Sequence, residues 1–347
     1  MKLKRVTAIL LAGVMAMGLV ACGSGSDTAA DTTTSTSTAT DTADDSESSD
    51  LLGSADATIH LKVGTTTAPD GHYVLGLVEM QKKLEEYSNG EMTLDIYPNS
   101  ALGGESDMMD AVSMGTQDMV LSSTGPIPDF SSATDNWATL DLPYLFETAE
   151  DAYKVLDGEI GQSLLDEFEG SGIKAIGFWE NGFRELTNNT KEVATPADLA
   201  GMKIRTMENA VHMATYTALG ATPTAMAWGE IFSALQQGTV DEVQKYITMI
   251  DLFYSPCVLM INEDIYNNFT DEQKEAFDKA AEDGKVAERQ ISQELASSAR
   301  ATMEAEGVVF TDVNKDEWVA AVQSVYDDAS LKIDQDLLAK IKAETAK

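Results

Sequence analysis

Strand-like and helix-like segments alternate along the chain from residue 58 to its end, and this alternation limits the fold more than any other feature. Residues 58–63 alternate apolar and polar side chains with a period of two, whereas residues 74–87 repeat apolar side chains at helical spacing. The same two patterns recur at 91–96 and 106–114. Because strands that alternate with helices favour parallel pairing, the sequence predicts α/β lobes with mainly parallel sheets.

A helical pattern of unusual length runs from Thr270 to Gly307. At 1.5 Å per residue it would measure about 55 Å, which is more than one lobe can span. We therefore expect the helix to bend at Gly284 or to cross from one lobe to another. The chain's 347 residues also exceed what one ordinary hydrophobic core accommodates, so two lobes are predicted.

The first 21 residues have the composition of an export signal. A basic stretch at 1–5 precedes an apolar stretch at 6–20, which is shorter than a membrane-spanning helix requires. Leu19-Val-Ala-Cys22 follows and resembles the bacterial lipobox, in which the cysteine is acylated and becomes the mature N-terminus. We predict a lipoprotein signal peptide at 1–21 and an acyl chain such as palmitate on Cys22. The alternative is an ordinary signal peptide with an incidental cysteine.

Residues 22–56 have a composition that disfavours folding. Nearly all of them are Ser, Thr, Ala, Gly or Asp, and none is aromatic or basic. Such a segment cannot bury enough apolar surface to offset the entropy of ordering it. We expect a disordered tether, which would span roughly 30 Å on average and lift the body off the membrane.

The charge balance excludes some partners and directs attention to the few cations. The chain has 58 acidic and 23 basic residues, for a formal net charge of −35. Nucleic acid and anionic membrane surfaces are therefore poor partners. Among five arginines, only Arg184 and Arg205 lie outside the leader and the long helix. If such an acidic protein binds an acid, these cations have to be concentrated in a buried site.

The sequence contains no recognisable catalytic constellation. His60, His72 and His212 are isolated from one another, and no nucleophile elbow, zinc motif or phosphate loop occurs. Cys257 has apolar neighbours, which predicts a buried thiol in a strand. These features predict a protein that is not an enzyme and that uses no metal or cofactor.

The positive signal lies around the two arginines. Arg184 follows Asn181-Gly-Phe in a strand-like segment, and Arg205 ends the strand-like segment 202–205 before a helix. Ligands of open α/β sheets settle beyond such strand ends, where a guanidinium can hold a carboxylate through two hydrogen bonds. The alternative is that each arginine pairs with a surface acid. Trp228 could likewise belong to the core or stack on a ligand.

Seven short motifs follow one another along the chain, each occurring once. They are Tyr97-Pro98 with Leu102-Gly-Gly-Glu105, Asp141-Leu-Pro-Tyr-Leu-Phe146, Asn181-Gly-Phe-Arg184, Ala197-Asp-Leu-Ala-Gly-Met-Lys-Ile-Arg205, Gly220-Ala-Thr-Pro-Thr224, Trp228-Gly-Glu230 with Ala234-Leu-Gln-Gln-Gly238, and Glu242-Val-Gln-Lys-Tyr246. Together they resemble the substrate-binding subunits of tripartite ATP-independent periplasmic (TRAP) transporters, of the dicarboxylate-binding DctP type. The resemblance covers essentially the whole body from Thr58 onward.

The resemblance implies a fold and its boundaries. It implies an α/β, two-lobe clamshell like that of periplasmic binding proteins, with a long helix that braces both lobes. Lobe I is expected to comprise 57–181 plus 256–295, and lobe II 182–255 plus 296–347.

The resemblance also implies which residues bind the substrate. Arg205 matches the arginine that binds the substrate carboxylate, and Arg184 matches a second contact. Asn209 and Trp228 match residues of the site wall. The opposite lobe is expected to contribute Thr66, Glu105 and Ser123.

One departure from the family pattern affects lobe II. Asp241 joins Glu242 directly, where the family has a further segment that carries a carboxylate-binding asparagine and a strand near the hinge. Roughly fifteen residues, about a strand and its connection, are missing.

The function implied is that of an extracytoplasmic receptor, lipid-anchored to the outer face of the bacterial cytoplasmic membrane. It would bind a C4-dicarboxylate or a sugar acid and deliver it to the small and large membrane subunits of a TRAP transporter. One alternative is a surface enzyme on a similar scaffold. The other is a non-transport surface lipoprotein, such as an adhesin, or a defective receptor, because of the missing segment.

Lipidation at Cys22 is directly testable. We expect Cys22→Ser to leave the precursor unprocessed and without lipid, because the acylated thiol would be absent. Metabolic labelling with a fatty-acid probe measures this, and equal label on the variant and the wild-type protein would contradict the assignment.

Overall fold

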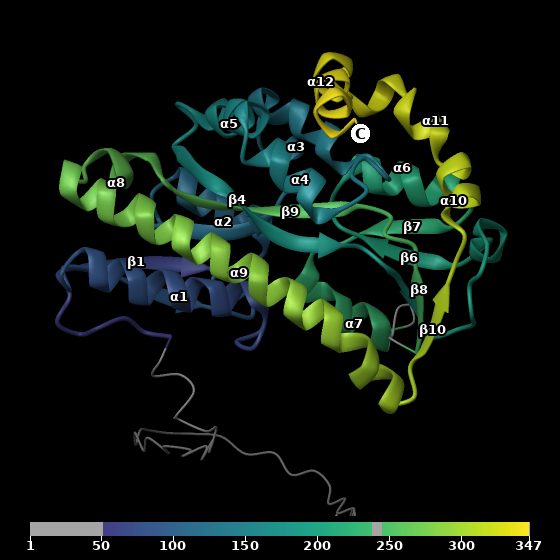
Figure 1. Ribbon diagram of the computed structural model, residues 1–347, viewed down its shortest axis with the longest axis horizontal. Coiled ribbons are helices and arrows are strands. Elements are labelled where there is room, and N and C mark those ends of the chain that lie inside the picture. Colours follow the sequence, from purple (N-terminus) through teal and green to yellow (C-terminus); the bar gives the residue numbers. More distant parts are fainter. Residues whose placement is uncertain (1–50, 238–244, 347) are drawn as a thin grey trace, which may run out of the picture. The chain divides into compact units, whose positions relative to one another are not determined.

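The computed structural model describes residues 51–237 and 245–346 (Figure 1). The expected signal peptide, Cys22 and the Asp241–Glu242 junction lie outside these residues. The end of the expected tether is described, and it contacts the body: the Leu51 carbonyl accepts a hydrogen bond of 2.8 Å from the Ile96 N–H. No helix in the described part is both long enough and apolar enough to span a bilayer.

Five strands form the largest sheet, in the order β2-β1-β3-β9-β4. They are β1 (Ile59–Gly64), β2 (Met92–Tyr97), β3 (Met119–Ser123), β4 (Ile173–Phe183) and β9 (Tyr254–Asn262). β1 pairs in parallel with β2 and β3, as predicted, but β9 runs antiparallel to β3 and β4. The prediction of mainly parallel pairing is wrong for this side of the sheet, because β9 enters it from lobe II and not through a strand–helix–strand crossover.

This sheet is covered on both faces, so its central strands are apolar at consecutive positions. In β3, Met119 and Leu121 pack into one hydrophobic cluster and Val120 into the other. In β9, Leu259 and Met260 divide in the same way, and all nine residues of the strand are buried. Successive side chains of a strand point to opposite faces, so two cores share one strand.

Two helices cover one face of the sheet, α1 (His72–Tyr87) and α9 (Asp271–Ala305). The 35 residues of α9 form one continuous helix, which begins at the Thr270 capping box and passes through Gly284. It contacts α1, β4 and a strand of lobe II, so it crosses between the lobes (Figure 1). Gly284 serves close packing: a Cβ there would lie 2.7 Å from the Met80 Cβ of α1.

The strands of lobe II form two small sheets. One has the order β10-β8-β5, and the other pairs β6 with β7 in parallel. The strands are β5 (Leu186–Asn188), β6 (Lys203–Thr206), β7 (Thr222–Ala225), β8 (Tyr246–Met249) and β10 (Val309–Asp312). Helix α6 (Ala210–Ala218) follows β6. The predicted lobe boundaries at residues 181/182, 255/256 and 295/296 stay a prediction.

The remaining helices of the described part are mostly short, and those of the C-terminal segment pack on lobe II and on the α4–α5 region. They are α2 (Glu105–Ser113), α3 (Ile127–Phe130), η1 (Ser132–Asp141), α4 (Ala149–Leu156), α5 (Glu159–Leu165), η2 (Asp166–Phe168), η3 (Pro196–Leu199), η4 (Trp228–Glu230), α7 (Ile231–Gln236), α8 (Glu263–Asn267), α10 (Lys315–Ala321), α11 (Gln323–Tyr326), η5 (Ala329–Leu331) and α12 (Gln335–Thr345).

The packing at Gly284 predicts an unusual response to a helix-favouring substitution. In an exposed helix, glycine to alanine stabilises by roughly 0.5–1 kcal/mol. We expect Gly284→Ala instead to lower the free energy of unfolding by about 1–3 kcal/mol, because the added methyl overpacks the α1–α9 contact. Denaturant titration measures this change.

Gly177→Ala is the matched control, since no atom lies within 4 Å of a Cβ at that position. If the Gly284→Ala protein were at least as stable as the wild type, α1 and α9 would be able to move apart without a cost in the free energy of unfolding.

Candidate ligand-binding site

A cavity of about 180 Å³ lies where the ends of lobe I strands face lobe II. Eleven residues line it, and most carry a polar group: Thr66, Thr67, Tyr73, Glu105, Ser123, Asn181, Phe183, Arg184, Arg205, Met207 and Trp228. Thr66 follows β1, Ser123 ends β3, and Glu105 begins α2. Residues far apart in the sequence therefore line one cavity.

Six of the seven residues expected to bind substrate line this cavity, namely Thr66, Glu105, Ser123, Arg184, Arg205 and Trp228. Sequence reasoning did not assign the other five. Asn181 and Phe183 belong to the same motif as Arg184, and Met207 follows Arg205 by two residues, so proximity to the arginines was an available signal. Thr67 and Tyr73 carried no comparable signal.

Asn209 lies outside this cavity. It is 5% exposed and caps α6, where its Oδ1 accepts a hydrogen bond of 3.0 Å from the His212 N–H. Its Nδ2 donates to the Gly125 carbonyl at 2.9 Å and to Asp141 Oδ2 at 2.7 Å. The side chain thus holds the start of α6 against lobe I, and its position does not bring it to the ligand wall expected from the sequence.

Arg205 lines the cavity from β6. Its Nε and Nη2 both donate to the Met226 carbonyl, at 3.0 and 2.8 Å. The guanidinium carbon lies 5.8 Å from the centre of the Trp228 ring. Trp228 itself is 59% exposed. The arginine therefore positions the segment after β7, and the tryptophan forms an exposed lip of the cavity.

Arg184 has uncharged hydrogen-bond partners. Its Nε donates to Ser255 Oγ at 2.8 Å, and its Nη2 contacts the Met207 sulfur. Among the residues that the structure describes, Arg184 forms no ion pair. Its backbone is held to the residue that precedes β9, since the Arg184 N–H donates to the Phe253 carbonyl at 2.8 Å. A guanidinium lined only by neutral acceptors favours an anion.

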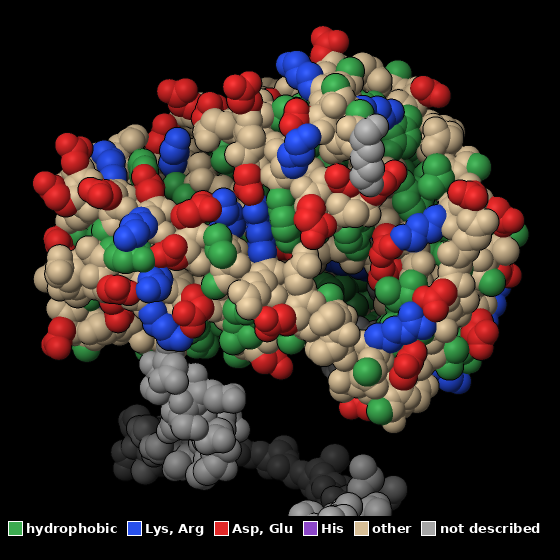
Figure 2. All heavy atoms as spheres, viewed as in Figure 1, with side chains coloured by type: hydrophobic (Ala, Val, Ile, Leu, Met, Phe, Trp, Pro, Cys, Tyr) green, Lys and Arg blue, Asp and Glu red, His purple; other side chains and the backbone are tan. Residues whose placement is uncertain are grey.

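Glu105 supplies a negative charge on the lobe I side. Its Oε1 accepts from the Ser123 N–H at 2.8 Å, and its Oε2 from Ser123 Oγ at 2.7 Å. As the first residue of α2, it also lies where a helix favours an acid. Two cations and one carboxylate thus line the cavity, whereas acidic side chains are spread over the face of the molecule that Figure 2 shows.

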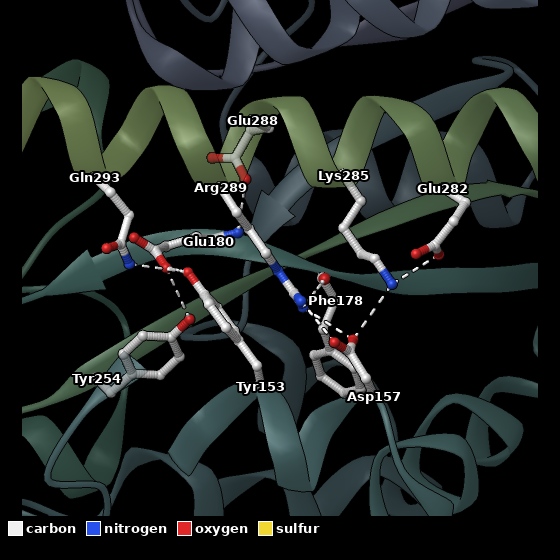
Figure 3. Close-up of polar contacts among 10 residues, drawn as sticks. All are labelled: Tyr153, Asp157, Phe178, Glu180, Tyr254, Glu282, Lys285, Glu288, Arg289 and Gln293. Atoms are coloured by element: carbon white, nitrogen blue, oxygen red, sulfur yellow. Dashed lines mark hydrogen bonds and ion pairs between the residues drawn. The ribbon is translucent and has the colours of Figure 1, made fainter. Parts of the chain in front are cut away.

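A buried polar network joins α9 to the strands that cross between the lobes (Figure 3). Glu288 on α9 is fully buried; its Oε2 accepts from the Glu180 N–H at 2.9 Å and its Oε1 lies 2.6 Å from His72 Nδ1. Burial raises the pKa of Glu288, although these two contacts oppose the rise. Arg289 donates to the Phe178 carbonyl at 2.7 Å.

The Glu180 carboxylate is the second buried acid of this network. It accepts hydrogen bonds from the Tyr153 hydroxyl, from the Tyr254 hydroxyl at 3.3 Å and from Ser292 Oγ at 2.9 Å. Hydrogen bonding of this kind makes a buried carboxylate tolerable, and removal of one partner is costly. The network therefore stabilises the point where β4 leaves lobe I.

The three histidines lie apart, each beside a different carboxylate. His60 contacts Asp95, His72 contacts Glu288, and His212 lies 3.4 Å from Asp141. Burial lowers the pKa of His212 despite the neighbouring acid. In the described ranges, no three His, Cys, Asp or Glu side chains are arranged to hold a metal ion. The Cys257 thiol is buried in β9, as expected.

Glu185, the neighbour of Arg184, is hydrogen-bonded to Asp251. Burial and the Asp251 carboxylate raise the pKa of Glu185 to about 8, although N–H groups of residues 250 and 251 hydrogen-bond to it. Burial works to raise the pKa of Asp251 as well, but hydrogen bonds from Glu185 and Lys315 hold it below its ordinary value.

This pair predicts a pH-dependent stability. The folded protein keeps a proton on Glu185 that the unfolded chain releases near pH 4.5, so the free energy of unfolding should fall as pH rises from about 4.5 to 8. Asp251 stays ionised over that window. We expect Glu185→Gln, which cannot ionise and still donates to Asp251, to remove on the order of 2 kcal/mol of this fall. Denaturant titrations at pH 5 and pH 8 measure the free energy of unfolding of both proteins. If it fell by the same amount in the variant and in the wild type, the role of Glu185 would be contradicted.

Comparison with known proteins identifies similar chains. Residues 63–332 match the family described as bacterial extracellular solute-binding protein, family 7. The 2,3-diketo-L-gulonate-binding periplasmic protein of Escherichia coli is 31% identical over 278 residues, which cover 76% of this chain and 84% of that protein.

Two solved structures are also similar. A TRAP periplasmic solute-binding protein from Polaromonas, bound to D-erythronate, superimposes with a TM-score of 0.79 at 34% identity and covers 83% of this chain and 100% of its own. A TRAP periplasmic solute-binding protein from Sulfurospirillum deleyianum, with bound succinate, has a TM-score of 0.76 at 27% identity and covers 83% and 99%. The two-lobe, periplasmic-binding-protein-like fold predicted from the sequence is confirmed by these likenesses.

Proposed function

Because the chain belongs to family 7 of the bacterial extracellular solute-binding proteins, which are receptors of TRAP systems, we propose that it captures a small organic acid between its lobes and delivers it to a TRAP transporter. The family is a class of solute receptors and not of enzymes. Relatives in this family bind small organic acids, among them D-erythronate and succinate.

One observation carries the proposal: Arg184 lines the cavity with a hydroxyl and a thioether as its acceptors. Both are weaker partners for a guanidinium than a carboxylate is, since ionised acceptors form hydrogen bonds roughly twice as strong. Arg205 lies on the same side of the cavity. A ligand carboxylate would accept from these arginines, with Arg205 as the expected anchor and Arg184 as the second contact.

The opposite side of the cavity favours a ligand with hydroxyl groups. Glu105 and the hydroxyls of Thr66, Thr67 and Ser123 line it. A second carboxylate would face the Glu105 carboxylate and be repelled, whereas a ligand hydroxyl can donate to it. A sugar acid with one carboxylate therefore fits the arrangement better than a C4-dicarboxylate does.

Closure and delivery complete the proposed function. The exposed Trp228 would cover a bound acid as the lobes close, and the closed form would dock on the membrane subunits, so that ligand binding selects the transport-competent state. Acylation at Cys22 would keep the receptor at the outer face of the membrane. The alternative of a defective receptor or adhesin rests on the missing segment at Asp241–Glu242.

The arginines provide the test. With D-erythronate as the probe, we expect Arg184→Gln and Arg205→Gln each to weaken binding by roughly two to four decades, because the buried carboxylate would lose a charged partner worth about 3–5 kcal/mol. Calorimetric titration measures the dissociation constants. Arg205→Gln should also lower the melting temperature, since the Met226 carbonyl would lose its two donors.

Arg300→Gln is the matched control, because Arg300 pairs with Asp312 on the surface, away from the cavity. We expect it to bind like the wild type. If both cavity variants bound within threefold of the wild type, the arginine assignment would be wrong. If the wild-type protein bound neither D-erythronate nor any other organic acid, the adhesin or defective-receptor alternative would be supported.

A further inference from the structure

Met207 lies across the cavity from lobe II to lobe I. It follows β6 by one residue, is 6% exposed, and directs its thioether between the two sides. Its sulfur contacts the Arg184 guanidinium and lies 4.0 Å from Ser123 Oγ at the end of β3. An apolar side chain thus fills the space between a cation and the opposite lobe.

The structure makes room for this side chain at Gly125. A Cβ at Gly125 would lie 2.3 Å from the Met207 Cε and 3.1 Å from its sulfur. Gly125 is not among the residues with positive φ, so its backbone conformation would accept alanine. A methyl group at this position would therefore displace the end of the Met207 side chain without straining the backbone.

Met207 also lines a second, smaller cavity. This cavity of about 20 Å³ is lined in part by Pro126, Glu208 and Ala227. Glu105, Arg205, Met207 and Trp228 line both cavities. Pro126 and Glu208 in turn border an open groove of about 400 Å³. Truncation of Met207 would enlarge the ligand cavity on the side that it shares with this space.

From this arrangement we infer that Met207 is a specificity-determining residue that limits the length of the acid the receptor accepts. A thioether adds no charge, so it shields Arg184 from water without neutralising it. The space beyond Met207 is bordered by Glu105 and Glu208, so a longer ligand that entered it would carry hydroxyls and not a second carboxylate there. This inference rests on the proposed function, because it concerns the same site.

The test compares a four-carbon and a six-carbon sugar acid, D-erythronate and D-gluconate. We expect the wild type to favour D-erythronate, and Met207→Ala to shift the ratio of the two dissociation constants toward D-gluconate by about tenfold or more, as expected when a pocket gains several methylene volumes. Met207→Leu, which nearly conserves volume, should keep the wild-type ratio. Adipate, a six-carbon acid with a second carboxylate and no hydroxyls, should gain nothing from Met207→Ala.

Gly125→Ala tests the same contact from lobe I. The added methyl should push Met207 into the cavity and weaken binding of both acids, and Met207→Ala in the same chain should restore D-gluconate binding. Melting temperatures verify that each variant folds. If Gly125→Ala and Gly125→Ala/Met207→Ala bound equally, the contact would not control the site.

The outcomes separate this inference from the proposed function. If the wild type bound D-erythronate and Met207→Ala left the ratio unchanged, the role of Met207 would be overturned while the receptor function stood. If the wild type bound no organic acid, both would be overturned.

Discussion

The contact between α9 and the edge strand β4 holds together the parts that make the cavity. β4 is the last strand of the five-stranded sheet, so its outer N–H and C=O groups have no further strand to pair with. Adjacent residues of α9 supply partners: Glu288 accepts from the Glu180 N–H, and Arg289 donates to the Phe178 carbonyl. The same helix packs on α1, which carries Tyr73 into the cavity, and β4 continues directly into Arg184.

This contact buries two carboxylates, and their cost explains the density of hydrogen bonds around them. Glu180 is 3% exposed and Glu288 is fully buried. An unpartnered buried charge would cost several kcal/mol, so each oxygen is bonded to a hydroxyl, an N–H or an imidazole. The network therefore fixes where α9 lies on β4.

The strongly acidic composition and the small cationic site have one physical explanation. Most carboxylates lie on the surface, where water and salt screen them, whereas Arg184 and Arg205 lie in a confined cavity where screening is weak. The proposed binding of an organic anion by two guanidinium groups is thus compatible with a net charge of −35.

The sequence by itself determined the α/β character, the long helix from Thr270 and the importance of the two arginines, because hydrophobic period, capping residues and scarce cations are local signals. The sequence also pointed to six residues that line one cavity, because its motifs and their order resemble those of a known family. Tertiary structure alone decided that β9 runs antiparallel, that Asn209 caps α6 outside the cavity, and that Gly284 serves packing and not a bend. It alone brought Met207 against Gly125, because contacts between residues over eighty positions apart depend on how the lobes meet and leave no periodic trace in the sequence.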